Sequence, residues 1–160
     1  MMGNGGYRHQ LDRARRFLER VLAGFEGLED LNDVEFQDMM WSFFQHCWHV
    51  KDWLHHDPLA LTAQKTAALA LAHQSSALMI CRDLCNGTKH LNLRHPSSGV
   101  GASHQYMDLD IDTGLGRYEV DCIIDDGRGT LISGKRLAQD CIAEWELILQ
   151  SQGLATARPS

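Results

Sequence analysis

The stretch VEFQDMMWSFFQHCWHVKDWLH, residues 34–55, decides the fold, because its apolar residues recur at helical spacing. Apolar positions three and four residues apart share one face of an α-helix and form a seam that packs on a core. The seam consists of Phe36, Met40, Phe43, Cys47, Val50 and Leu54. Because Trp41, Phe44 and Trp48 widen this apolar face, we expect other elements to contact the helix on more than one side.

Three further helices are predicted from the same kind of pattern. The first runs from Tyr7 to Phe25, and the third runs from Leu59 to Lys89, where Ala and Leu residues give the first half high helix propensity. A final helix runs from Lys135 to Gln150. Residues 153–160 contain no apolar periodicity and are predicted to form a frayed, flexible tail.

The last third of the chain contains strand periodicity before its helix. Residues 106–112 and 118–124 alternate between apolar and polar side chains, and a short run at 130–132 follows a Gly-rich turn. We therefore expect a mainly α fold, an antiparallel helical bundle with a small antiparallel β-hairpin or meander before the C-terminal helix. The predicted units are a helical bundle over 7–95, a β-hairpin or meander over 104–133 and a C-terminal helix over 135–150, in one domain of residues 1–155.

Composition limits the class of protein. The chain has 160 residues, 44% of them hydrophobic, which is enough for one domain with one core. With 15 basic and 21 acidic residues, its net charge of −6 excludes a surface covered by nucleic-acid-binding charge but leaves room for a local basic patch. Five scattered cysteines indicate reduced thiols, and no apolar stretch is long enough to span a membrane, so we expect a cytoplasmic protein with no membrane partner.

Polar residues interrupt the apolar faces of the second and third helices. In the second helix they are His46, His49, Lys51 and Asp52. In the third helix Asp83, Asn86 and His90 share one face, because they are three and four residues apart. A charge beside a packing face must be paired or hydrogen-bonded, so we expect the two faces to satisfy each other. The candidate pairs join Asp52 or His49 to Asn86, Lys89 or His90.

Three interpretations of this polar cluster are open from the residues. A histidine beside a carboxylate can act as an acid or base near neutral pH, and Arg82, Lys89 or Arg94 could hold a phosphate. Alternatively, the cluster is a structural polar network without chemistry. A metal shared by His46, His49 and either Asp83 or His90 is the third interpretation, but no metal-hydrolase motif accompanies these histidines, so we expect neither metal nor cofactor.

The run Asn86-Gly-Thr-Lys-His90, at the end of a long helix in a helical bundle, resembles the motif of the HEPN superfamily. Members are small α-helical domains, often dimeric, and many are metal-independent ribonucleases of toxin–antitoxin, phage-defence or RNA-processing systems. Their motif places an Arg just before the polar residue. Here Cys85 stands at that position and Arg82 lies three residues earlier. The run His-x-Lys-Asp-Trp53 followed by Asn-Gly-x-Lys-His90 also resembles a group of short uncharacterised bacterial proteins.

The resemblance implies an RNA- or nucleotide-binding homodimer that is a degenerate ribonuclease. The implied catalytic residues are His90 as base, with Asn86 and Asp52 orienting it. Arg82 and Lys89 would contact phosphate, and the supporting polar residues are His49, Lys51 and Asp83. The alternative is a non-enzymatic module, such as an antitoxin-like or scaffold subunit, that binds a protein partner and uses the cluster only structurally.

Two charged segments complete the sequence analysis. Arginines crowd the first helix, where they form either a solvated face, with Asp12 and Arg16 as an i,i+4 pair, or a phosphate-facing surface. The acidic run from Asp108 to Glu119 mimics the spacing of an EF-hand loop, but Thr113 occupies the position that requires Gly. Aspartates alternating along a half-exposed strand are the simpler interpretation.

Overall fold

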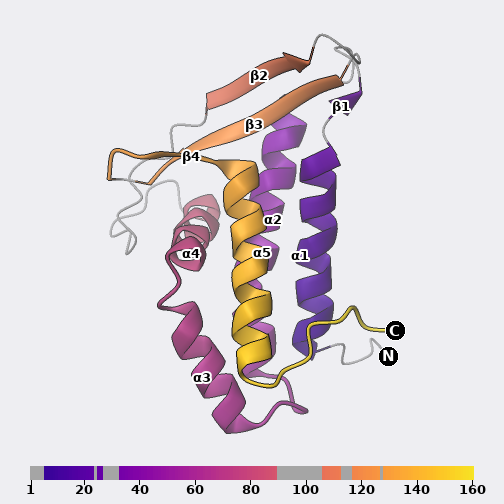
Figure 1. Ribbon diagram of the computed structural model, residues 1–160, viewed down its shortest axis with the longest axis vertical. Helices are drawn as coiled ribbons and strands as arrows, with labels where there is room; N and C mark the ends of the chain where they lie inside the picture. Colours follow the sequence, from indigo (N-terminus) through magenta and orange to yellow (C-terminus); the bar gives the residue numbers. More distant parts are fainter. Residues whose placement is uncertain (1–5, 24, 27–32, 90–105, 113–116, 127) are drawn as a thin grey trace.

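The computed structural model describes residues 6–23, 25–26, 33–89, 106–112, 117–126 and 128–160. Its helices are α1 (Gly6–Ala23), α2 (Asp33–His55), α3 (Thr62–Ala72), α4 (Ser76–Lys89) and α5 (Gly134–Ser151). Its strands are β1 (Phe25–Glu26), β2 (Tyr106–Asp112), β3 (Arg117–Asp125) and β4 (Leu131–Ser133). The five helices pack together, and the sheet covers one end of them (Figure 1). The mainly helical fold with an antiparallel hairpin before the C-terminal helix is confirmed.

The predicted seam of α2 forms the centre of the core. All six of its residues are at most 1% exposed, because α2 packs on α1, α4 and α5. Phe44 and Trp48 are also buried, which confirms that neighbours contact α2 on more than one side. The helix α5 lies between α1 and the α3–α4 pair and contributes Trp145, which is fully buried (Figure 1).

The predicted third helix is two helices. The chain leaves the helical path at residues 73–75, between α3 and α4, instead of continuing from 59 to 89. The hydroxyl of Ser75 accepts a hydrogen bond from the backbone N–H of Leu78 and thereby starts α4. Leu71 near the end of α3 is 36% exposed, whereas Leu78 in the first turn of α4 is fully buried. The Gly at position 87 lies inside α4 and does not end it.

The sheet has β3 at its centre. Both β2 and β4 pair antiparallel with β3, as the strand periodicity predicts. Phe25 was expected at the end of the first helix, but it belongs to β1 and pairs with Tyr118 of β3. Asp108 and Asp110 lie on β2 opposite Asp121 and Glu119 of β3. The described parts of the acidic run, Asp108–Asp112 and Arg117–Glu119, therefore lie on strands, and they do not have the helical flanks of an EF-hand.

Asp121 connects the sheet to α5. Its carboxylate accepts hydrogen bonds from the backbone N–H groups of Cys122 and Lys135 and from the hydroxyl of Ser133. Lys135 is in the first turn of α5, where backbone N–H groups have no partner within the helix. At Gly134 a Cβ atom would lie 2.7 Å from the carbonyl oxygen of Cys122, so only glycine allows this close approach of helix and strand.

The segment 153–160 differs from the predicted frayed tail. Leu154 is buried, and the carbonyl of Ala155 accepts a hydrogen bond from the hydroxyl of Tyr7 on α1, with an O–O distance of 2.7 Å. The side chain of Gln64 on α3 donates to the carbonyl of Gln152 just before this segment. Side-chain donors far away in the sequence thus hold the segment, and periodicity does not reveal them. In the described part of the chain, every helix is too short or too polar to cross a membrane.

A pair of leucines on α5 tests this packing. Leu149 is fully buried and Leu147 is 64% exposed. We expect Leu149→Ala to lower the free energy of unfolding by ~2–5 kcal/mol, because it leaves a cavity in the core. The same change at Leu147 should cost less than ~0.5 kcal/mol. Chemical denaturation of both variants measures the difference, and equal losses would contradict the position of α5.

Candidate functional site

The polar cluster predicted on the third helix lies on α4. Arg82 donates from Nε to Oδ1 of Asp83 at 3.1 Å, and Asp83 is only 2% exposed. The side chain of Arg82 is 17% exposed, and its Nη2 atom is buried with no hydrogen-bond partner among the described residues. A guanidinium nitrogen in this position needs an acceptor, because burial removes the water that would otherwise bind it.

The proposed catalytic motif begins one turn further along α4. Asn86 is half-buried, three residues after Asp83 on the same helix. Lys89 is the last residue of α4, and only its backbone is described. The position of His90, the predicted base, lies outside the described residues, as does that of Arg94. Within the motif, side-chain surroundings are therefore described for Asn86 and not for Lys89 or His90.

The polar residues of α2 divide between two directions. His49 lies against α4, where its Nε2 atom is 4.0 Å from the sulfur of Cys85, the neighbour of Asn86. Asp52 is instead paired with Lys51 through an Nζ–Oδ1 contact of 2.5 Å, and it is exposed. No hydrogen bond joins Asp52 to Asn86 within the part of the chain that the structure describes. The structure thus places His49 beside α4 and gives Asp52 a different partner from the one expected.

Asp52 borders a cavity at the C-terminal end of α2. The cavity has a volume of about 370 Å³ and is lined by Gly6, Asp52, Trp53, His56, Asp57 and Pro58. The carboxylate of Asp57 accepts hydrogen bonds from the backbone N–H groups of Tyr7, at 3.2 Å, and Leu59, at 2.8 Å. Asp57 therefore caps the start of α1 and fixes the turn after α2, which gives it a structural role.

His46 and His49 face different neighbours. His46 stacks on Phe17 of α1, with ring centroids 4.9 Å apart, and its Nδ1 atom is 3.3 Å from the amide nitrogen of Gln10. Burial and the positive charge of Arg13 lower the pKa of His46 below its ordinary value. His46 thus belongs to the α1–α2 contact, while His49 faces α4.

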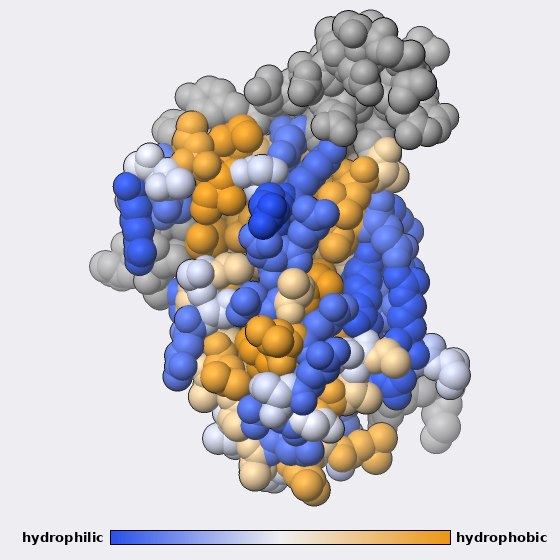
Figure 2. All heavy atoms as spheres, in the orientation of Figure 1, coloured by the Kyte–Doolittle hydropathy of each residue, from blue (hydrophilic) through white to orange (hydrophobic). Residues whose placement is uncertain are grey.

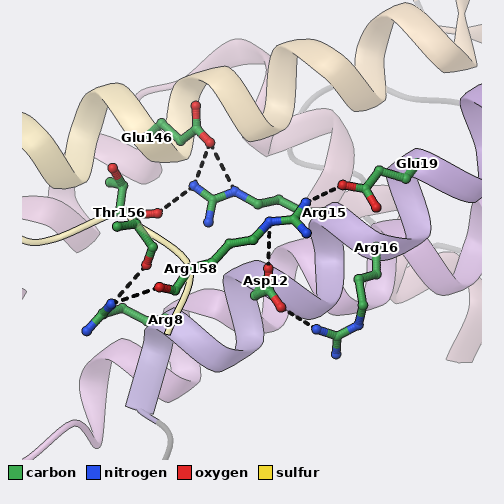
Figure 3. A network of polar contacts seen from close by, with 9 residues as sticks. Arg8, Asp12, Arg15, Arg16, Glu19, Glu146, Thr156 and Arg158 are labelled. Atoms are coloured by element: carbon green, nitrogen blue, oxygen red, sulfur yellow. Dashed lines mark hydrogen bonds and ion pairs between the residues drawn. The ribbon is translucent and has the colours of Figure 1, made fainter. Parts of the chain in front are cut away.

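The arginines of α1 bind partners within the molecule. Arg15 pairs with Glu146 of α5, with an Nη2–Oε1 distance of 2.6 Å, and donates to the carbonyl of Thr156 (Figure 3). Arg8 donates to the carbonyls of Ala157 and Arg158. The basic helix thus holds the segment 153–160 in place. Figure 2 shows hydrophilic residues gathered along the α1 side of the molecule.

Carboxylates of α1 in turn bind an arginine of the segment 153–160. Arg158 lies between Asp12 and Glu19 and contacts both carboxylates (Figure 3). The predicted i,i+4 pair of Asp12 and Arg16 is confirmed. Because these charges neutralise one another locally, neither a purely solvated face nor a surface dedicated to phosphate describes the helix well.

Sequence reasoning missed a cluster of three thiols. The sulfurs of Cys47, Cys81 and Cys141 lie within 4.8 Å of one another, and all three residues are fully buried. Cys47 belongs to the predicted seam of the second helix, but nothing in the spacing shows that three helices bring these sulfurs together. Burial alone would raise the pKa of Cys47, but hydrogen bonds to its sulfur from Cys141, Cys81 and Trp145 lower it to about 5.

The low pKa of His46 leads to a pH prediction. The folded protein holds the imidazole neutral, while the unfolded chain takes up a proton near pH ~6.5. Stability contributed by the neutral ring is therefore present above that pH and is lost as the pH falls toward the lower folded pKa. We expect His46→Gln to flatten this part of the pH dependence of unfolding. The matched control is His55→Gln, an exposed histidine on the same helix, and an equal effect of both variants would contradict the assignment.

The chain was compared with known families, proteins and structures. No protein-family model, curated protein or solved structure matches the chain.

Proposed function

We propose that the protein is a HEPN-like domain that binds RNA or a nucleotide at the C-terminal half of α4. Arg82 would contact phosphate, and Asn86 and His90 would act on the adjacent ribose. The observation that carries this proposal is the buried Nη2 atom of Arg82, which has no acceptor among the described residues. A phosphate oxygen is the acceptor that a guanidinium binds most favourably.

The neighbours of Arg82 agree with this role. Asp83 engages Nε and thereby fixes the orientation of the guanidinium. Arg15 also has a buried nitrogen without a partner, but its other nitrogens already bind Glu146 and Thr156. Cleavage in this scheme needs no metal. His90 would remove the proton of the 2′-hydroxyl, whose oxygen would bond to phosphorus as the bond to the 5′-oxygen breaks. The 5′-oxygen would leave with a proton from water, while Arg82 stabilises charge on the phosphate.

A double variant tests the proposal. Arg82→Gln combined with Asp83→Asn removes both charges of the buried pair, so that neither is left alone in the core. We expect this variant to lose RNA affinity by ~10-fold or more, in filter binding with EDTA present. The control is Arg136→Gln with Asp140→Asn, an exposed pair on α5 with the same Nε–Oδ1 distance of 3.1 Å. Unchanged melting temperatures show that both variants fold.

Cleavage is tested separately with His90→Ala in the same buffer. Loss of RNA cleavage in this variant, with wild type active in EDTA, supports a metal-independent ribonuclease. Binding that depends on Arg82 without cleavage in wild type supports a domain that binds but does not cut. No RNA or nucleotide binding by the wild type would overturn the proposal.

A non-enzymatic interaction module is the second candidate, and exposed apolar residues favour it. Leu59 is 89% exposed, Leu61 is 67% exposed and Trp53 is 39% exposed, all near the passage from α2 to α3. Hydrophobic atoms are visible at this end of the molecule in Figure 2. If this surface forms the expected homodimer, Leu59→Asp with Leu61→Asp should convert the protein to a monomer in light scattering. A wild type that is already monomeric at high concentration would contradict self-association.

A further inference from the structure

The three buried thiols form a compact set of ligand atoms contributed by three separate helices. Cys47 is on α2, Cys81 is on α4 and Cys141 is on α5. None of the three has measurable exposure, and each sulfur lies within 4.8 Å of the other two. Three sulfurs around one metal at ~2.3 Å would be separated by ~4 Å, so binding needs side-chain shifts of less than ~1 Å.

Two of these thiols also make long contacts with backbone carbonyls. Cys81 is 3.4 Å from the carbonyl of Phe44, and Cys141 is 3.5 Å from the carbonyl of Ala77. A thiol is a weak hydrogen-bond donor, and these long contacts cost little to lose. Both carbonyls belong to helix backbones, so they keep acceptor roles within α2 and α4 when the thiol protons leave.

The number and type of ligands select the metal. Structural zinc sites are almost always four-coordinate, and the described residues supply no fourth ligand within this cluster. Hard ions such as Mg²⁺ and Ca²⁺ require oxygen ligands, which the cluster lacks. Soft thiolate ligands select Cu⁺ among the ions that accept a lower coordination number. We propose that Cys47, Cys81 and Cys141 bind one Cu⁺ ion in a closed three-sulfur site.

Binding at this position would join the helices of the core. The ion replaces thiol protons, which pass to solvent, so its affinity rises with pH. Because α2, α4 and α5 each contribute one ligand, the bound ion stabilises the folded chain relative to the unfolded chain. This inference does not rest on the RNA proposal. Cys81 directly precedes Arg82 in the chain, but its thiol contacts the carbonyl of Phe44, and none of the three cysteines belongs to the Asn86–His90 motif.

The test is a Cu⁺ titration of the reduced, full-length protein against a chromogenic Cu⁺ chelator, without oxygen and with a non-thiol reductant. We expect one Cu⁺ per chain for wild type and a higher melting temperature when the ion is bound. Separate Cys47→Ser, Cys81→Ser and Cys141→Ser variants should each lose affinity by more than ~10-fold and lose the melting shift.

The chain supplies its own matched controls. Cys85 and Cys122 are also buried cysteines, but neither belongs to the cluster. Cys85→Ser and Cys122→Ser should keep one Cu⁺ per chain. The helical circular dichroism of each apo variant is recorded, so that loss of binding is attributed to the ligand only in variants that fold.

Three results would overturn the assignment. The first is the absence of Cu⁺ binding by folded wild type. The second is Cu⁺ binding that survives all three cluster substitutions. The third is binding of Zn²⁺ with higher affinity than Cu⁺, in a parallel titration, because that result requires a fourth ligand and contradicts a three-sulfur site.

Discussion

The contact between Trp145 and α2 is the interaction on which the remaining structure depends. The indole N–H of Trp145 donates to the backbone carbonyl of Cys47 at 3.0 Å, and both residues are fully buried. This contact fixes α5 against α2, and α5 also packs on α1, α3, α4 and the sheet. Asp121 holds the start of the same helix, while Leu154 packs just beyond its end. A change in the position of α5 would therefore disturb every layer of the fold.

Much of the fold follows from local patterns in the sequence. The seam from Phe36 to Leu54 and the strand alternation around β2 and β3 depend on periodicity, which the finished core preserves. The break between α3 and α4 cannot be predicted from periodicity, because the residues on both sides favour helix. There the hydroxyl of Ser75 caps the start of α4. The sequence also did not predict that the segment 153–160 is held in place, because its partners include arginines more than a hundred residues away.

The candidate site was predicted less completely than the fold. The sequence predicts that Asp83, Asn86 and His90 share one face of a helix. Asp83 and Asn86 do lie three residues apart on α4, and His90 lies outside the described residues. Which faces meet across helices depends on crossing geometry, and Asp52 pairs with its neighbour Lys51 because a local partner costs less conformational entropy than a distant one. The thiol cluster likewise depends on which helix faces meet. Its three cysteines are separated by up to 94 positions (141 − 47), a relationship that no local pattern encodes.

The central position of α5 has a consequence for the chain as it is synthesised. Helices α1 to α4 leave the ribosome before α5, so the apolar side chains that α5 covers stay accessible to water and to other chains until α5 has also emerged. Hydrophobic contacts that must wait for distant residues slow folding and favour aggregation. The first four helices are therefore expected to be most prone to contacts with other chains in the interval before α5 covers them.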